Sequence, residues 1–255
     1  MKIKKYLGQH FLKSRFHLNL IAKSLKIKKE DVILEIGAGE GNLTRFLKKA
    51  KKIIAIEIDK DLINKLEKRK IKNLEIILED VRKIDFNLLI EKYKITKICG
   101  NIPYYLSGFL FRKILELNHF PEILVFLIQK EMAQKIVPKK NENFLSIAFK
   151  LVGKTKIISF LKKELFFPKP KVDSAILKVE FFKTQKSLDF RKKFFEFLKL
   201  GFLHPNKILI SNLAKKYPKE KLKEIFKKYN LSLNLRAYHL SLKDWLILFK
   251  EIQKI

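Results

Sequence analysis

The sequence has 255 residues, enough to bury a full core, and 47% of them are hydrophobic, which predicts a globular protein with one large domain and a small one. No run approaches the ~18 apolar residues of a membrane span, so we expect no membrane association. The formal net charge of +31, from 57 basic and 26 acidic residues, indicates a polyanionic partner.

The charge also has a second explanation, because only 7 of the 57 basic residues are Arg. Lys, Ile, Phe and Asn are abundant together, as a compositional bias of the genome would produce. The C-terminal part is nevertheless clearly basic, since residues 184–255 carry 17 Lys and Arg against 6 Asp and Glu. Charge and length together favour a nucleic-acid partner.

The N-terminal residues indicate the cellular compartment, and the number and spacing of cysteines and histidines indicate whether a metal site is expected. Met1-Lys-Ile-Lys-Lys5 resembles the basic start of a secretion signal, but no apolar block follows, so we expect a cytoplasmic protein. The lone Cys99 excludes an internal disulfide, and the five histidines show no metal-ligand spacing. We therefore expect no metal site.

The chain begins with Gly8-Gln-His-Phe-Leu12, for which we find no generic structural purpose, and continues with helical spacing from Phe16 to Leu25. Residues 31–41 then combine a buried strand with a G-x-G-x-G turn, and a helix is predicted over 42–47. Glycines allow positive φ and close approach of a ligand, and a helix N-terminus favours negative charge. Nucleotide, flavin and methionine-derived cofactors all use such turns.

Polar side chains end the next strands. The strand at 53–58 carries Glu57, twenty residues after Gly37, where a carboxylate accepts hydrogen bonds from ribose hydroxyls. A lone carboxylate in an apolar strand would otherwise be costly, although a capping or surface acid is the alternative. The strand at 74–78 leads to Asp80, which is well placed for an adenine amino group or is simply a loop acid.

The strand at 95–99 leads to Asn101-Ile102-Pro103-Tyr104, at the strand end where ligands bind in open α/β sheets. Pro103 fixes φ and stiffens the turn. The Asn101 carboxamide oxygen and the Ile102 or Pro103 carbonyl could accept both protons of a purine amino group while Tyr104 stacks on the ring. Two such hydrogen bonds draw the lone pair of the amino nitrogen out of conjugation with the ring and make that nitrogen nucleophilic. An ordinary Asn-x-Pro turn is the alternative.

The order of these strand ends points to one cofactor. A glycine turn, a ribose acceptor, an adenine acceptor and an amino-nitrogen acceptor argue against a hydride carrier, which would leave the Asn-Ile-Pro-Tyr segment without a task. They favour S-adenosylmethionine, whose sulfonium makes the methyl group electrophilic, so that catalysis mainly requires alignment of the nucleophile.

The remaining elements close the sheet and add a helical tail. Strands are predicted at 123–128, 157–161 and 175–181, giving seven in all, with helices at 130–137 and 144–152. Between the last two strands, Leu165 to Lys171 form a proline-stiffened loop in which Phe166 or Phe167 could clamp a base opposite Tyr104, while at least one of the two packs under the loop. A linker is expected near 183–187. Helical spacing follows it, with Asp189 and Ser241 as expected N-caps.

Over nearly its full length the chain resembles the ribosomal RNA adenine N6-dimethyltransferase family. No single match is decisive, but seven in order are highly specific. The matching segments are Gly8-Gln-His-Phe-Leu12, Glu35-Ile-Gly-Ala-Gly-Glu-Gly41, Ile56-Glu-Ile-Asp59, Glu79-Asp80, Gly100-Asn-Ile-Pro-Tyr104, Gln129-Lys-Glu-Met-Ala133 and Phe166-Phe-Pro-Lys-Pro-Lys-Val-Asp-Ser-Ala175.

The resemblance implies an α/β fold with a Rossmann-like seven-stranded class I methyltransferase sheet in residues 1–183 and a small helical RNA-binding domain in 188–255. It also implies site residues, with Phe166 as the base-facing ring. The implied catalytic residues are Asn101, Ile102, Pro103, Tyr104 and Phe166, and the implied S-adenosylmethionine-binding residues are His10, Leu12, Gly37, Glu57, Asp80 and Asn101.

Two positions and one segment depart from the family pattern. His10 stands where relatives often have Asn, Tyr105 replaces a frequent Asn, and residues 202–208 carry fewer arginines than is usual. Either side chain at position 10 can form hydrogen bonds, and Tyr105 bears on pocket shape more than on chemistry. We therefore expect residues 202–208 to bind RNA phosphates more weakly, or several lysines to share these phosphate contacts.

Within the family, Gln129 to Ala133 and Val172 to Ala175 fit the small-subunit enzyme better than the large-subunit enzyme that confers antibiotic resistance. The implied product is N6,N6-dimethyladenosine at two adjacent adenines in the 3′-terminal hairpin of small-subunit rRNA, made by a monomer acting on that RNA or on an immature small subunit during ribosome biogenesis. A non-catalytic ribosome-assembly factor is the rival from another class. A DNA adenine methyltransferase is less favoured, since those enzymes usually have two prolines after the first residue of this motif.

Overall fold

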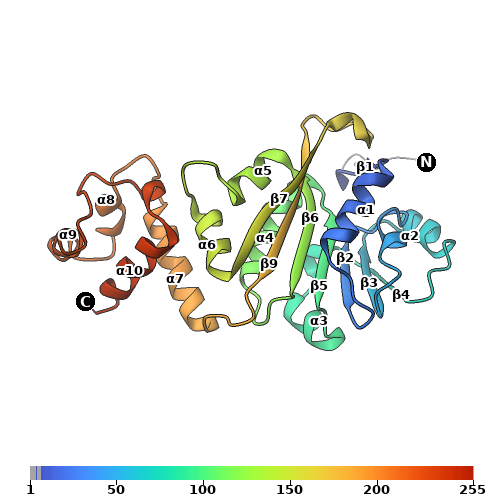
Figure 1. Ribbon diagram of the computed structural model, residues 1–255, viewed down its shortest axis with the longest axis horizontal. Helices are drawn as coiled ribbons and strands as arrows, with labels where there is room; N and C mark the ends of the chain where they lie inside the picture. The colour runs from blue at the N-terminus through green and yellow to red at the C-terminus, as the bar shows by residue number, and fades with distance from the viewer. Residues whose placement is uncertain (1–3, 5–6, 255) are drawn as a thin grey trace. The chain divides into compact units, whose positions relative to one another are not determined.

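The computed structural model describes residue 4 and residues 7–254, so most of the signal-like start Met1–Lys5 lies outside the described residues. The chain forms two compact units (Figure 1). One comprises Met1–Gln134 and Lys154–Lys183, and the other comprises Lys135–Gly153 and Thr184–Ile255. None of the described helices is long and apolar enough to cross a membrane.

The first unit is built on a seven-stranded sheet with the order β4-β3-β2-β5-β6-β9-β7. Neighbours from β4 to β6 pair in parallel, and β9 pairs antiparallel to β6. The predicted seven-stranded α/β sheet is confirmed. Its strands are β2 (Val32–Ile36), β3 (Lys52–Glu57), β4 (Leu74–Leu78), β5 (Lys97–Asn101), β6 (Ile123–Gln129), β7 (Gly153–Leu161) and β9 (Ser174–Phe181).

The helices around this sheet are α1 (Arg15–Ser24), α2 (Lys60–Glu67), α3 (Phe86–Tyr93), α4 (Ser107–Leu115) and α5 (Lys130–Ile136), with 3₁₀ turns η2 (Thr44–Phe46), η3 (Val81–Lys83), η4 (Tyr104–Leu106) and η5 (Lys163–Leu165). Helices α2, α3 and α4 make the crossovers between successive parallel strands from β3 to β6, whereas the connection from β2 to β3 contains only η2. The helix predicted over 42–47 is only the single turn η2. Successive i→i+3 bonds there bring Leu43 and Leu47 into the core, with exposed fractions of 4% and 0%.

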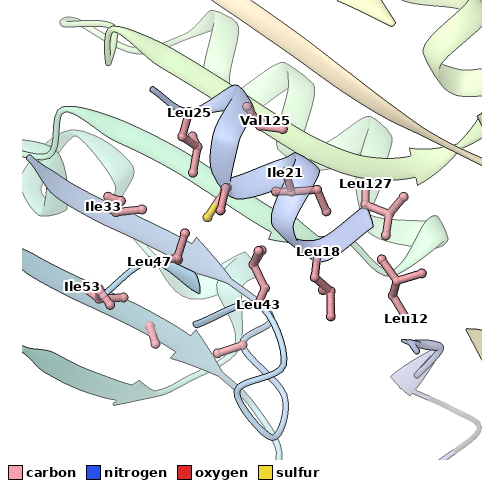
Figure 2. Packing of buried hydrophobic residues seen from close by; sticks show 14 of the residues in the cluster. Leu12, Leu18, Ile21, Leu25, Ile33, Leu43, Leu47, Ile53, Val125 and Leu127 are labelled. Atoms are coloured by element: carbon pink, nitrogen blue, oxygen red, sulfur yellow. The ribbon is translucent and has the colours of Figure 1, made fainter. Parts of the chain in front are cut away.

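The core around α1 explains how the N-terminal segment is held on the sheet. Figure 2 shows Leu18 and Ile21 of α1, and Leu25 directly after it, in one cluster with the β6 side chains Val125 and Leu127. Each fully buried leucine or isoleucine stabilises the fold by about 1.5–3 kcal/mol relative to exposure. The segment just before α1 is therefore firmly anchored next to the strand ends.

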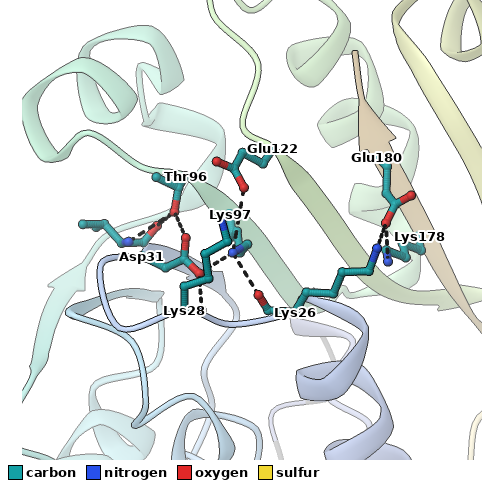
Figure 3. A network of polar contacts seen from close by, with 9 residues as sticks. Lys26, Lys28, Asp31, Thr96, Lys97, Glu122, Lys178 and Glu180 are labelled. Carbon is teal, nitrogen blue, oxygen red and sulfur yellow. Dashed lines mark hydrogen bonds and ion pairs between the residues drawn. The ribbon is translucent and has the colours of Figure 1, made fainter. Parts of the chain in front are cut away.

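A polar network lies where β2 and β5 begin, at the sheet edge opposite the strand C-termini (Figure 3). The buried Lys97 ammonium forms an ion pair with the buried Asp31 carboxylate and donates to the Lys26 carbonyl at 3.2 Å. Thr96 Oγ1 donates to Asp31 Oδ1 at 2.9 Å. The network therefore ties together the chain segments that enter the two central strands.

A second, two-stranded sheet was not anticipated. Strand β1 (Phe11–Leu12) pairs antiparallel with β8 (Phe166–Phe167), and Lys13 N donates to Leu165 O at 2.9 Å. The register sets Leu12 opposite Phe166 and Phe11 opposite Phe167. This pairing joins the N-terminal stretch to the proline-rich loop.

The second unit is helical, with α6 (Phe144–Val152), α7 (Leu188–Gly201), α8 (Leu209–Leu213), α9 (Lys219–Lys228), η6 (Ala237–His239) and α10 (Leu242–Ile252). Its core is aromatic: the ring centroid of Phe197 lies 5.6 Å from that of Trp245 and 5.5 Å from that of Phe249. The division differs from the expected one in residues 135–153, because α6 buries its apolar side chains against α7 and α10.

The two expected N-caps of this unit had different outcomes. Ser241 caps α10 in a capping box with Asp244, which confirms that prediction. The prediction of Asp189 was wrong. Ser187, two residues earlier, accepts the Phe190 amide at 3.2 Å and begins α7.

Candidate active site

A cavity opens at the C-terminal ends of the parallel strands, entirely within the first unit. Its volume is about 1030 Å³ with its open mouth included, which is a size typical of ligand sites. The sheet edge is also where α/β proteins bind their ligands. The structure brings nine predicted site residues together in its lining: His10, Leu12, Gly37, Glu57, Asp80, Asn101, Ile102, Pro103 and Tyr104.

The glycine turn after β2 holds the carboxylate of Glu57. Gly39 has φ +58°, a conformation that favours glycine, and its amide donates to Glu57 Oε2 at 2.8 Å. The amides of Ile58 and Asp59 both donate to Glu57 Oε1 at 2.9 Å. A carboxylate has about four acceptor positions, so about one remains for a ligand hydroxyl. Burial raises the pKa of Glu57 although these three amide bonds oppose the shift.

Asp80 lies at the cavity wall and is held by Arg82. Its Oδ1 accepts from the Arg82 backbone amide at 2.9 Å, and the guanidinium Nε donates to Oδ2 at 2.9 Å. This hydrogen bonding with Arg82 keeps the pKa of Asp80 below its ordinary value. The carboxylate is therefore ionised and fixed, and Arg82 takes up much of its capacity to accept hydrogen bonds.

Asn101 ends β5 with a defined amide orientation. Its Nδ2 donates to the backbone carbonyl of His10 at 2.7 Å. Because a carbonyl can only accept, the carboxamide oxygen must point the other way. The carbonyls of Ile102 and Pro103 were the two candidates for the second acceptor of the amino group, and the hydrogen bonds favour Ile102. Pro103 O accepts from Leu106 N at 2.9 Å, whereas no donor to Ile102 O is found in the described part of the chain.

Tyr104 and His10 form a stacked pair beside Asn101. Their ring centroids lie 5.7 Å apart with an interplanar angle of 28°. The Tyr104 and Ser174 hydroxyls share a hydrogen bond of 2.7 Å, and burial raises the pKa of Tyr104, so the phenol is neutral. His10 Nδ1 lies 2.7 Å from Pro168 O. The carbonyl requires a proton on Nδ1, which leaves Nε2 as an acceptor in the neutral ring.

Phe166 is the one predicted site residue that the structure does not bring to the cavity. Its side chain is 3% exposed and packs in the core cluster with Leu12 and Leu18, because the β1–β8 pairing turns it inward. Phe167 is the exposed ring of the pair, at 49%. The expectation that Phe166 faces the base is therefore corrected, since its ring supports the loop from beneath.

Glu35 is a cavity residue that the sequence analysis quoted only as part of a motif. It is the penultimate residue of the apolar strand β2, is 1% exposed, and its Oε2 has no hydrogen-bond partner among the described residues. Burial raises the pKa of Glu35 to about 8. Like Glu57, Glu35 is an acid inside an apolar strand, where a carboxylate is costly without a partner, and this is the signal in the sequence that marks it as a candidate site residue.

The Gly8 to Leu12 stretch has a structural purpose that becomes visible here. Gln9 Nε2 donates to Asp59 Oδ2 at 2.8 Å, and Lys4 Nζ lies 2.5 Å from Asp59 Oδ1. Asp59 is buried just after β3 and begins α2. These contacts lay the N-terminal segment across the strand ends, where it forms one wall of the cavity.

The charge of the cavity contrasts with that of the chain. No Lys or Arg of the described residues lines it, although the net charge is +31. A pyrophosphate-bearing nucleotide would be poorly matched to such a lining, whereas a cationic ligand is well matched. The acidic lining residues are Glu35, Glu40, Glu57, Glu79 and Asp80.

Comparisons with known proteins agree over nearly the whole chain. The family model described as ribosomal RNA adenine dimethylase matches residues 1–254. The ribosomal RNA small subunit methyltransferase A of Mycoplasma capricolum subsp. capricolum is 38% identical over 261 residues, covering 99% of this chain and 98% of that protein. The protein of the same name from Fusobacterium nucleatum subsp. nucleatum is 35% identical, with 98% and 97% covered.

Solved structures give the same answer. A dimethyladenosine transferase from Plasmodium falciparum superimposes with a TM-score of 0.83 at 27% identity, covering 96% of this chain and 98% of that one. The family match, the curated relatives and this likeness all extend across both compact units. The chain therefore belongs to the ribosomal RNA adenine dimethylase family.

Proposed function

We propose that this protein uses S-adenosylmethionine to dimethylate N6 of two adjacent adenines in the 3′-terminal hairpin of small-subunit rRNA. The observation that carries the proposal is an acid-lined cavity, without Lys or Arg among its described lining residues, that adjoins Asn101 in a strongly basic protein. The cavity suits a cationic cofactor and the basic exterior suits RNA. Closely similar proteins carry the name small subunit methyltransferase A.

The cavity residues fit S-adenosylmethionine on structural grounds. The unpartnered buried Oε2 of Glu35 and the remaining acceptor position of Glu57 are sites for ligand donors, and the positive-φ glycine turn lets a ligand approach the backbone. When bound, S-adenosylmethionine supplies a methyl group made electrophilic by its sulfonium. We assign its binding to His10, Leu12, Gly37, Glu57, Asp80 and Asn101, all of which line the cavity.

The chain's part in catalysis is to orient and activate the adenine amino group. Asn101 Oδ1, turned away from His10, accepts one N–H, and the Ile102 carbonyl accepts the other. These two hydrogen bonds draw the lone pair of the amino nitrogen out of conjugation with the ring. Tyr104, held by Ser174, stacks on the base, and Pro103 keeps the turn rigid. A base must leave its stack to reach this site, which costs least in a single-stranded loop.

No strong side-chain base is needed, because the amino nitrogen becomes acidic once it is methylated. A second transfer requires that the first methyl group rotates aside. The helical segment 188–255 contributes RNA contacts through its basic residues in this proposal. We further propose that the protein is a cytoplasmic monomer and that it acts on an immature small subunit.

The test is radiolabelled methyl transfer onto undermethylated small subunits, followed by mapping of the marks on both ribosomal RNAs by mass spectrometry. We expect N6,N6-dimethyladenosine at two adjacent adenines near the 3′ end of the small-subunit RNA. Marks confined to large-subunit RNA would overturn the substrate assignment. Calorimetry that detects no S-adenosylmethionine binding would instead favour a non-catalytic assembly factor.

A further inference from the structure

We propose that Phe167 and Lys13 form a stacking platform at the cavity mouth for an unpaired RNA base next to the target adenine. The proposal rests on the proposed function, because it assumes an RNA substrate whose target base enters the cavity.

The β1–β8 pairing decides which aromatic ring faces outward. Neighbouring residues on a strand point to opposite faces, and residues opposite each other in register share a face. Leu12 and Phe166 therefore share one face, and both are buried in the core, at 2% and 3% exposure. Phe11 and Phe167 share the other face. Phe11 and Leu12 both line the cavity, so both residues of β8 lie next to its wall, and Phe167 is the one of the two whose ring is exposed to solvent there.

The exposed ring is already paired with a cation. Phe167 is 49% exposed, and Lys13 Nζ lies 4.5 Å from its ring centroid. A flat ring offers a stacking surface that any base can use, and an adjacent ammonium attracts the phosphate that accompanies the base. The combination suits a nucleotide better than an apolar protein surface, which would leave the charge of Lys13 unmatched.

The same loop continues into a lysine-lined hollow, which supports RNA as the occupant. Four lysines and three acids line it. Two of the acids, Glu164 and Asp173, pair with Lys169 and Lys162, and the third, Glu131, forms no ion pair with the described residues. Within the described chain no ion pair engages Lys163 or Lys171, so both remain available to phosphates. The lining residues are Lys130, Glu131, Lys162, Lys163, Glu164, Lys171, Val172 and Asp173.

The platform serves a neighbouring base and not the target itself. Tyr104 lines the cavity, whereas Phe167 does not. A base on Phe167 therefore stays outside while the adenine beside it enters. Stacking the neighbour would hold the RNA strand open at the point where the target leaves its stack.

The experiment measures binding of a hairpin RNA carrying two adjacent loop adenines, by fluorescence anisotropy at fixed salt. We expect Phe167→Ala to bind about 5- to 150-fold more weakly, and Phe167→Trp to bind at least as well as the natural protein. The matched control is Phe182→Ala. Phe182 is 40% exposed and follows β9 at the opposite edge of the sheet, so the control should bind normally.

A scan with single abasic nucleotides locates the stacked base. One position beside the target should weaken binding to the natural protein, and that loss should vanish in Phe167→Ala, as expected for two groups in contact. Unchanged binding by Phe167→Ala, or additive losses at every abasic position, would overturn the proposal. Binding is read without methyl transfer, so a failure of the proposed activity would appear separately, as absence of methylation by the natural protein.

Discussion

At the scale of single residues, the amide of Asn101 makes two different contacts, and this separates catalysis from binding. Its nitrogen is held by the His10 carbonyl at 2.7 Å, which leaves the oxygen for the substrate. We predict that Asn101→Ala lowers the single-turnover rate by about 10²-fold, because a misplaced amino group is poorly aligned. RNA affinity should stay within about twofold, since phosphate contacts dominate it.

Single-turnover methylation and anisotropy on the same RNA would check this prediction. Asn101→Asp is an informative companion, because a carboxylate keeps an acceptor but cannot donate to the His10 carbonyl. It should also be slow. Equal losses of rate and affinity in Asn101→Ala would contradict the role assigned to the side chain.

A second prediction at this scale concerns Glu35 and the pH dependence of the free energy of unfolding. Its pKa is about 8 in the folded protein against an ordinary 4.5. Between these values the folded protein holds a proton that the unfolded chain has released, so unfolding releases a proton. The free energy of unfolding should therefore fall by up to ~1.4 kcal/mol per pH unit as the pH rises through this window.

The neutral isostere Glu35→Gln should remove this part of the pH dependence. Urea unfolding of both proteins, at several pH values between about 5 and 7.5 and without cofactor, measures the slopes. The variant should keep a shallower slope, because burial also raises the pKa of Glu57. Identical slopes in the two proteins would contradict the assignment of Glu35 as a buried neutral acid.

The sequence predicts site residues well where chemistry and strand position coincide. Glu57 and Asn101 end their strands and Asp80 follows its strand, and the ends of these parallel strands must meet at one edge of the sheet. The orientation of Phe166 was not predictable in this way. Which of two adjacent phenylalanines faces outward depends on pairing with β1, and two-residue strands carry no periodic signal.

At the scale of elements, the ion pair between Asp31 and Lys97 fixes the entry to the two central strands. Both side chains are almost fully buried. We predict that Asp31→Ala costs about 3–5 kcal/mol in the free energy of unfolding, because it leaves the buried ammonium with only the exposed Glu122 carboxylate, 4.0 Å away, as its counter-charge. Asp31→Leu combined with Lys97→Met should recover much of that loss, since no buried charge then remains.

Denaturant unfolding measures the loss, and Lys26→Ala is the matched control. Lys26 pairs with Glu180 at 2.8 Å, but its side chain is 67% exposed, so losing that pair should cost about 0–1 kcal/mol. Similar losses in Asp31→Ala and Lys26→Ala would show that burial does not decide the strength of this network.

Elements with long apolar runs were predicted to within a few residues, because buried parallel strands and amphipathic helices dominate the local pattern. The 3₁₀ turn η2 and the β1–β8 pair were not. Leu43 and Leu47 have helical spacing, but i→i+3 bonds bury them in a single turn. Tertiary packing decides such short segments.

At the scale of the whole molecule, a basic exterior surrounds an acid-lined cavity, and the two should respond differently to salt. We predict that RNA affinity falls more than about tenfold between 50 and 200 mM salt, which requires as few as three phosphate contacts. S-adenosylmethionine affinity should change far less, because the residues proposed to bind it line the cavity. Anisotropy and calorimetry over the same salt series check both. A flat RNA response would contradict a phosphate-binding exterior.

The helical spacing of the apolar residues predicted a helical tail but not the unit to which α6 belongs. The segment 135–153 lies between the strand β6 and the strand β7 in sequence, so chain order placed it with the sheet. Its apolar surface packs on α7 and α10 instead. Chain order cannot reveal such an exchange, because it depends on which apolar faces meet.

The pairing of β1 with β8 has a consequence for the time at which the enzyme becomes competent. His10 and Pro168, which share a hydrogen bond, are 158 positions apart. During synthesis, the wall formed by residues 8–12 stays unclamped until the loop around residue 167 has left the ribosome tunnel. A nascent chain that already has the glycine turn and Asn101 therefore has an unfinished pocket. Competence arrives late in translation, after every strand but β9 has been made.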